Sequence, residues 1–363
     1  MTQVIKFRLL KSTIIIPYAF FLENREMKGS DYIKTDRSKI RLIRYGVQWA
    51  IFSLVLYAGV LFYLFVEDLE KGIIPTFKRP SSVDGFMPIG GFMALRLWLS
   101  EGIFDPVHPS GLVILGGAFI ISFLFRKSFC GWVCPVGTLS ELVSKSGRWI
   151  AGRSLKMPVY IDYPLRSVKY LLMTFFLYVI LIKMTPQSIW SFLNTPYWKV
   201  ADIKLLKFFV EPSSTTLIVL FVLFLFSLFY KNFWCRYLCP YGALLGLLAV
   251  FGPSRIKRDK ERCINCGLCS KNCPSSLPVD KKRLVHSPEC TGCLTCVSYC
   301  PSDGALDMSI GGKVIPPFLF SLLAIGIFSG LIILGKLTGH WSSSVSPEEL
   351  MELMPYLNRL VHP

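Results

Sequence analysis

Long apolar runs separated by charged segments dominate the chain. Five of them approach the roughly 20 residues that a helix needs to cross a bilayer, and they lie at residues 46–66, 106–125, 168–185, 212–230 and 314–335. The third run is the weakest, because its apolar core, Tyr170–Ile182, is short and Lys183 follows it. The stretch 85–104 is also apolar, but Arg96 and Glu101 favour an interfacial or re-entrant segment there. The pattern predicts an α-helical membrane protein with about five transmembrane helices.

The distribution of charge predicts which ends of these helices face the cytoplasm. With the N-terminus inside, the cytoplasmic segments are 1–45, 126–169 and 231–313, and they hold 30 of the 40 Lys and Arg but only 12 of the 23 Asp and Glu. This excess follows the positive-inside rule, so the net charge of +17 requires no nucleic-acid partner. The positive mean hydropathy of +0.49 likewise indicates a membrane protein. We expect a multi-pass protein of the bacterial inner membrane, with its C-terminus outside.

Eight of the twelve cysteines form two identical runs that read C-x2-C-x2-C-x3-C-P. This spacing is typical of bacterial two-cluster ferredoxins, in which the fourth cysteine of each run ligates the other cluster. It predicts one [4Fe-4S] cluster on Cys263, Cys266, Cys269 and Cys300, and another on Cys290, Cys293, Cys296 and Cys273. Structural zinc is the alternative, but zinc sites use C-x2-C pairs rather than this doubled run. We expect an inserted ferredoxin-like α+β domain on the cytoplasmic side, where thiols stay reduced.

The other four cysteines belong to an internal repeat with an offset of 105 residues. Residues 126–139 read RKSFCGWVCPVGTL and residues 231–244 read KNFWCRYLCPYGAL, each after a predicted span. The spacing i, i+4 predicts that the two cysteines of a pair share one helical face, so two neighbouring hairpins could bring the pairs together. These candidate redox or metal thiols are Cys130, Cys134, Cys235 and Cys239. A metal ion, a third cluster and a redox-active dithiol stay open, as do buried cysteines that act as small hydrophobes.

Five segments follow from these features. They are a cytoplasmic N-terminal segment (1–45), a membrane domain of two hairpins (46–253), the two-cluster ferredoxin domain (254–310), the last transmembrane helix (311–335) and an outer tail (336–363). The run Thr13–Phe21 is interrupted by Pro17, and we expect it to lie at the membrane interface. The tail should form a short amphipathic helix that begins at Ser346 and Pro347. His108 and His340 could bind haem or accept quinol protons, but surface histidines are the simpler interpretation.

The segments FCGWVCPVGTL and WCRYLCPYGAL, together with the two ferredoxin runs, resemble the NapH, NosR and CcoG group of membrane polyferredoxins. The resemblance covers about residues 100–310. It implies a helical membrane domain with a cytoplasmic two-cluster ferredoxin, and electron transfer linked to the quinone pool or to the maturation of respiratory enzymes. It is strongest for NapH-like members, because the 28 residues of the tail leave no room for the additional outer domains of the other two.

Two functions are compatible with these features. The first is an electron-transfer subunit, quinol dehydrogenase-like, that passes electrons between the quinone pool or a redox partner protein and the two clusters. The second is a maturation or regulatory factor for a respiratory metalloenzyme, in which the C-x3-C-P thiols reduce or sense a metal. A transporter is disfavoured, because the predicted spans hold almost no polar residue apart from Lys183. We favour the first, which needs two [4Fe-4S] clusters and leaves bound quinone open.

Overall fold

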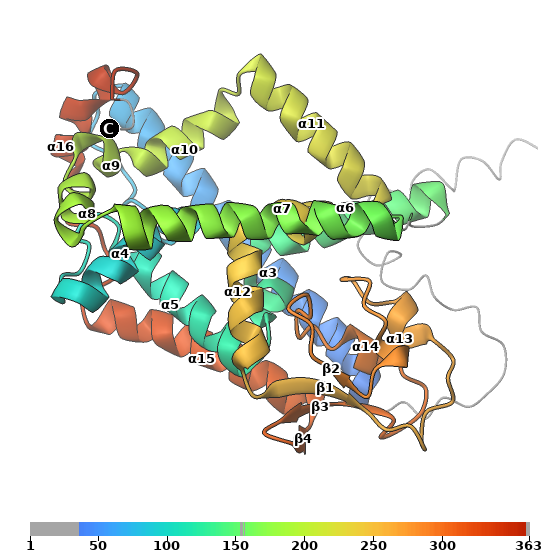
Figure 1. Cartoon of the computed structure of the whole chain (residues 1–363). Coiled ribbons are helices and arrows are strands. Elements are labelled where there is room, and N and C mark those ends of the chain that lie inside the picture. Colours follow the sequence, from blue (N-terminus) through green and yellow to red (C-terminus); the bar gives the residue numbers. More distant parts are fainter. Residues whose placement is uncertain (1–35, 153–154, 156, 361–363) are drawn as a thin grey trace, which may run out of the picture. The chain divides into compact units, whose positions relative to one another are not determined.

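A computed structural model describes residues 36–152, 155 and 157–360. The predicted interfacial run Thr13–Phe21 and most of the N-terminal segment lie outside the described residues, as does His362. The structure is mainly helical, with one small sheet (Figure 1). The helices at the five predicted spans are α3 (Asp36–Glu70), α5 (Pro109–Leu124), α7 (Val159–Tyr178), α11 (Ser214–Phe229) and α15 (Pro317–Leu337).

Three helices of the described residues are long and apolar enough to cross a membrane, and they match three predicted spans. They cover Lys39–Glu70, Val159–Lys183 and Pro317–Leu337. The predicted fourth span is α11, which reaches sufficient length only together with α10, from which it is bent by 74°. The predicted second span is α5, which has 16 residues. Length and composition therefore support three spans, or four with the bent pair, and a fifth stays a prediction.

The remaining helices connect these elements or cap their ends. They are α4 (Pro88–Glu101), α6 (Pro135–Ala151), α8 (Pro186–Leu193), α9 (Pro196–Lys199), α10 (Ala201–Val210), α12 (Pro240–Phe251), α13 (Leu268–Lys271), α14 (Thr295–Ser298) and α16 (Pro347–Leu353). The single turns are η1 (Ser81–Phe86), η2 (Phe129–Val133), η3 (Val179–Lys183), η4 (Trp234–Leu238), η5 (Val279–Lys281) and η6 (Met354–Tyr356). Many begin with proline, whose missing N–H costs nothing in the first helical turn.

Helix α4 occupies the apolar stretch 85–104. It has 14 residues, packs against α5 and α8, and ends at Gly102 in the left-handed conformation. At this length it is too short for a regular span, which agrees with the interfacial or re-entrant segment expected there.

The tail begins its helix as the sequence predicts. The Ser346 side chain accepts a hydrogen bond from the backbone N–H of Glu349, and Pro347 is the first residue of α16. Leu350 of α16 is buried in a cluster with Phe62 and Phe65, which lie toward the C-terminal end of α3.

The ferredoxin-like part forms a four-stranded antiparallel sheet in the order β2-β1-β3-β4. Its strands are β1 (Ser254–Arg258), β2 (Leu284–Val285), β3 (Leu306–Ile310) and β4 (Lys313–Ile315). Ile256 is paired with Val285 on one side and Met308 on the other, and all three are buried. The short helices α13 and α14 each contain one cysteine of a run and accompany the sheet.

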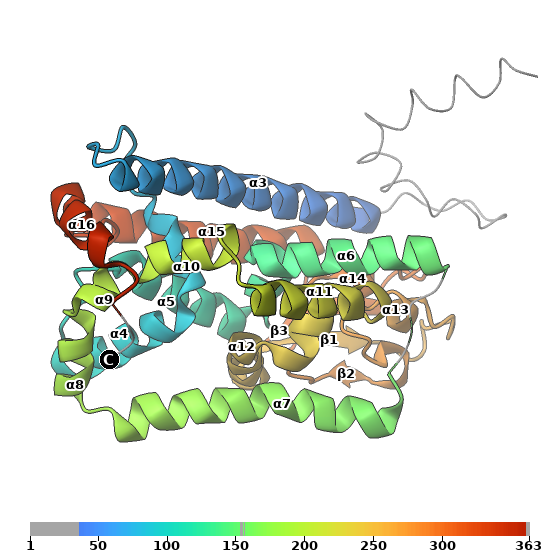
Figure 2. The ribbon, with the colours of Figure 1, turned by 90° about the horizontal axis from the view of Figure 1, so that it is seen from above.

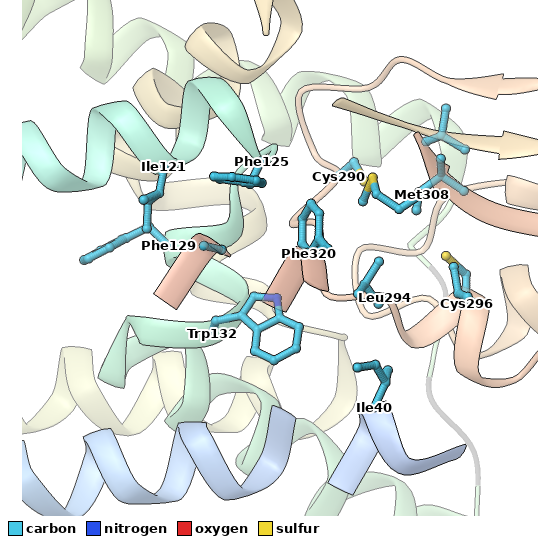
Figure 3. Close-up of a cluster of buried hydrophobic side chains, with 14 of the residues drawn as sticks. Ile40, Ile121, Phe125, Phe129, Trp132, Cys290, Leu294, Cys296, Met308 and Phe320 are labelled. Carbon is cyan, nitrogen blue, oxygen red and sulfur yellow. The ribbon is translucent and has the colours of Figure 1, made fainter. Parts of the chain in front are cut away.

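A hydrophobic cluster joins this part to the membrane helices (Figure 3). Ile40 from the start of α3 and Phe320 from the start of α15 lie in one cluster with Leu294 and Met308 of the ferredoxin-like part. Phe125, just after α5, packs edge-on against Phe320 with 5.4 Å between ring centroids. Figure 2 shows α3 and α7 on opposite sides of the α5, α11 and α12 group. The ferredoxin-like part is therefore docked on the helices rather than attached only by its connections.

Candidate metal centres

Two cavities in the ferredoxin-like part are each lined by four cysteines. The first set comprises Cys273, Cys290, Cys293 and Cys296. The second set comprises Cys263, Cys266, Cys269 and Cys300. Each set combines three cysteines of one run with the fourth cysteine of the other, because the chain crosses between the two halves after α13 and α14. Four sulfur donors around one cavity suit an iron–sulfur cluster or a zinc ion.

The two sets differ in exposure. All four cysteines of the first set are buried, and apolar side chains such as Ile256, Leu277 and Val285 line the same cavity. In the second set Cys266 is exposed and the other three are partly buried. Burial raises the pKa of Cys273 to about 12, so this thiol becomes a thiolate only beside a positively charged centre. The first set thus faces the membrane helices, and the second set faces solvent.

The backbone around both cavities has the same unusual conformation. Asn265 and Gly267 have φ angles of 55° and 71°, and the equivalent positions 27 residues later, Gly292 and Leu294, both have φ of 57°. A left-handed leucine costs roughly 1–2 kcal/mol, so the loop keeps this shape at the expense of local stability. Left-handed residues of this kind are typical of backbone concavities whose N–H groups suit an anionic ligand such as thiolate sulfur.

The structure also brings together the four cysteines of the repeat. Cys130, Cys134, Cys235 and Cys239 come from the two halves of the membrane domain, and all six pairs of these thiols interact electrostatically. Burial raises the pKa of Cys134 to about 11, and it also raises the pKa of the other three above the ordinary value. As free thiols they would stay protonated near neutral pH. Thiol–disulfide chemistry needs the thiolate, because the thiolate and not the thiol is the nucleophile. This makes a redox-active dithiol the weaker of the alternatives.

The prediction that each pair shares one helical face is wrong. Cys130 and Cys235 lie in the π-helical turns η2 and η4, whereas Cys134 and Cys239 have extended backbone and are the N-caps of α6 and α12. The physical reason is the proline after each second cysteine, which disfavours helical backbone for the residue before it. Each pair therefore bridges the end of one helical turn and the start of the next helix.

The glycine of the C-P-x-G segment has a steric role in the first copy. A Cβ atom on Gly137 would lie 2.5 Å from the carbonyl oxygen of Cys130. Glycine therefore allows the first turn of α6 to fold back against the turn that carries Cys130.

The same helix starts supply hydrogen bonds to sulfur. The Cys239 Sγ accepts a hydrogen bond from the backbone N–H of Gly242 at 3.2 Å, and the backbone amides of Val136 and Gly137 favour the thiolate of Cys134. Two helix N-termini, which carry partial positive charge, therefore point at this group of thiols.

The turn with Cys130 contacts the loop of the buried cysteine set. A Cβ atom on Gly131 would lie 2.6 Å from the carbonyl oxygen of Thr291 and 3.5 Å from the Cβ of Cys293. The indole N–H of Trp132 donates to the carbonyl oxygen of Gly292 at 3.1 Å (Figure 3). The four-thiol group and the buried set are therefore neighbours.

A buried charge cluster lies beside both. Glu289, directly before Cys290, accepts from Lys169 of α7 at 2.6 Å, and its other oxygen lies 3.6 Å from the Lys127 Nζ. Burial alone would lower the pKa of Lys127, but Glu289 and the neighbouring Cys130 and Cys235 outweigh it and raise that pKa. No local sequence pattern indicates this cluster, because its three members lie 42 and 120 residues apart.

His108 is buried, contrary to the simpler expectation of a surface histidine, because Asp84 of η1 and Trp198 lie against its ring. Its ring nitrogens lie 2.9 Å from an Asp84 oxygen and 2.8 Å from the Trp198 carbonyl oxygen. Asp202 completes a group of three ligand atoms within 4.8 Å of one another. However, the Arg79 guanidinium already lies 2.7 Å from Asp202, so the group is a buried ion-pair network. His340 is exposed, as expected, with its ring 4.4 Å from that of Phe104.

Comparison with known proteins agrees with the cysteine chemistry. A family model described as a 4Fe-4S binding domain matches residues 107–157 and 215–259, and a 4Fe-4S dicluster domain matches residues 255–301. The chain is 40% identical to the putative electron transport protein YccM of Escherichia coli, over 88% of this chain and 91% of that protein. It is 31% identical to the ferredoxin-type protein NapH of Escherichia coli over 54% of this chain and 68% of the relative. No solved structure matches.

Proposed function

Since the chain belongs to the NapH-like family of membrane polyferredoxins, we propose that it passes electrons between the quinone pool, or a partner redox protein, and two [4Fe-4S] clusters on the cytoplasmic side of the membrane. One relative is named a putative electron transport protein and another a ferredoxin-type protein. The proposal adds the ligands, the side of the membrane and the partners. Each [4Fe-4S] cluster supplies one-electron transfer, at a potential between roughly −700 and +450 mV.

The observation that carries the proposal is the crossed grouping of cysteines around two cavities. We assign one cluster to Cys273, Cys290, Cys293 and Cys296, and the other to Cys263, Cys266, Cys269 and Cys300. Three features support the fit: four sulfur donors line each cavity, the backbone N–H concavities suit their charge, and no three cysteine sulfurs of the described residues lie within 4.8 Å of one another. Four sulfurs around one zinc ion would stand about 3.8 Å apart.

The difference in exposure suggests a direction of contact. The buried set lies against α5 and α15, where a membrane-embedded donor or acceptor would have to approach. The exposed set presents Cys266 and Ile264, which is 65% exposed, to solvent. A soluble redox partner would therefore meet the protein at the loop 263–269.

The cytoplasmic placement rests on charge and on the two ends of α3. The ferredoxin-like part contacts Ile40 near the start of α3, while α16 of the tail packs near its other end at Phe62 and Phe65. If α3 crosses the membrane, these two parts lie on opposite sides. The basic segments 126–169 and 231–313 then face the cytoplasm, as the positive-inside rule requires.

The ligand assignment can be tested with the full chain purified anaerobically. We expect at least about eight irons and eight sulfides per chain and EPR signals from two interacting clusters after reduction. C273A should damage the cluster that resists an iron chelator, and C300A should damage the cluster that the chelator reaches. Fewer than eight irons, bound zinc in their place, or the opposite pairing of variants with clusters would overturn the assignment.

The partner and the side of the membrane need separate measurements. In proteoliposomes, a quinol should reduce the clusters, or a quinone should oxidise reduced clusters, faster than in vesicles without quinone. Dithionite, which does not cross the membrane, should reduce the clusters at once in inverted membrane vesicles and slowly in right-side-out vesicles. Equal rates with and without quinone would leave the partner redox protein as the only donor, and fast reduction in right-side-out vesicles would overturn the cytoplasmic placement.

A further inference from the structure

We propose that Cys130, Cys134, Cys235 and Cys239 hold a third [4Fe-4S] cluster, with two ligands from each copy of the internal repeat. The inference rests on the proposed electron-transfer function and extends it into the membrane domain. Neither copy supplies four ligands by itself, so this site exists only where the two hairpins meet.

The arrangement of the donors fits a cluster better than a single ion. All six pairs of thiols interact electrostatically, so the four sulfurs surround one region. Yet no three of them lie within 4.8 Å of one another among the described residues, whereas thiolates on one zinc ion would stand about 3.8 Å apart.

Both halves of the site are built to stabilise negative charge on sulfur. Cys134 and Cys239 are the N-caps of α6 and α12. The Cys239 Sγ accepts from the Gly242 N–H at 3.2 Å, and the first amides of α6 favour the thiolate of Cys134. The proline after each cysteine lacks an N–H at the first helical position, so the next amides serve the sulfur. The motif C-x3-C-P-x-G thus supplies two thiolates and one helix N-terminus per copy.

The buried lysines beside the site also require negative charge on its sulfurs. Lys127 and Lys169 are 4% and 0% exposed, and within the described part of the chain they share one carboxylate partner, Glu289. Burying the second ammonium needs another negative group nearby. Lys127 interacts electrostatically with Cys130 and Cys235, and four thiolates around an oxidised cubane carry about two net negative charges. A neutral set of four thiols would leave this excess of positive charge unbalanced.

The position of the site connects it to the buried ferredoxin set. The turn η2, which carries Cys130, contacts Thr291 and Cys293 through Gly131, and Trp132 donates to Gly292. The four-thiol site, the buried set and the exposed set therefore follow one another from the membrane domain to the solvent. The two matches of the 4Fe-4S binding domain model, at 107–157 and 215–259, each contain one of the cysteine pairs.

The test is the metal content of the full chain, purified anaerobically. We expect about twelve irons per chain instead of about eight, with a third EPR signal after reduction. The C130A/C235A variant should lose about four irons and that signal, while the ferredoxin signals stay. Trp234→Phe changes the same turn as Cys235 without removing a thiol, and it should keep all the iron.

The outcomes separate this inference from the proposed function. About eight irons in the unmodified protein, with both ferredoxin signals intact, would overturn the third cluster and leave the proposed function standing. One zinc or copper ion that is lost in C130A/C235A would also overturn it, because a single ion would then occupy the site. A content below eight irons would contradict the proposed function itself. The iron content of the unmodified chain decides between these outcomes, so the test holds even if the C130A/C235A variant fails to fold.

Discussion

Replacing Glu289 with glutamine should loosen the docking of the buried cysteine loop on the membrane helices. The change keeps the shape of the side chain but removes the carboxylate that faces Lys169 at 2.6 Å and Lys127 at 3.6 Å. Both ammonium groups are buried. Removing one partner of a buried pair costs about 3–5 kcal/mol, because the remaining charge has no counterpart.

The pKa of Glu289 gives an independent magnitude. Burial alone would raise this pKa, but Lys127 and Lys169 outweigh burial and lower it from 4.5 to about 2. At 1.36 kcal/mol per unit, the shift corresponds to about 3 kcal/mol. Because the pKa of the folded state lies below that of the unfolded chain, this stabilisation is present above pH 4.5 and is lost as the pH falls toward about 2.

Amide hydrogen exchange of residues 286–296 in detergent measures the effect. A loss of about 3 kcal/mol should raise local opening about 100-fold at neutral pH, and the difference between E289Q and the unmodified protein should shrink below pH 4. Exposed Glu261→Gln is the matched control and should leave exchange unchanged. The double variant E289Q/K169M removes an unpaired ammonium together with the carboxylate, so it should recover part of the loss. Unchanged exchange in E289Q would refute the reasoning. So would a double variant whose loss of local stability equals the sum of the losses in E289Q and K169M.

Three further substitutions test other contacts. Trp132→Phe should destabilise the contact between η2 and the buried cysteine loop by about 1–3 kcal/mol, because the buried Gly292 carbonyl loses its donor. Thermal loss of the visible iron–sulfur absorption measures this destabilisation, and an unchanged midpoint would contradict the prediction. Gly137→Ala should lower stability by about 1–3 kcal/mol, because its Cβ would lie 2.5 Å from the Cys130 carbonyl oxygen. The control Gly116→Ala, which has open space around it, should leave the midpoint of the same melting assay unchanged. Arg79→Met should lower the free energy of unfolding by about 3–5 kcal/mol, because it leaves Asp202 buried without a counter-charge. In the same chemical unfolding assay, Lys71→Met at the exposed pair with Glu67 should cost under about 1 kcal/mol. Equal losses for the two variants would refute the burial argument.

The sequence by itself determined the features that depend on local spacing. Ferredoxin cysteines occur at fixed short intervals because three of them must wrap one cluster within a single loop, so the doubled run indicated the cofactor directly. Apolar runs of span length and an excess of basic residues in alternate loops likewise predicted a helical membrane protein. The cap at Ser346 could also be predicted, because it depends on residues three positions apart.

Only the tertiary structure decided what lies between distant segments. It placed the two C-x3-C-P pairs, 105 residues apart, in one group, and it replaced the expected helical face by a π-helical turn followed by a new helix, since proline after each second cysteine interrupts regular helix. It buried His108 between Asp84 and Trp198. It joined Lys127, Lys169 and Glu289 into one charge cluster. These contacts depend on how helices pack, and local spacing carries no information about partners more than a helical turn or two away.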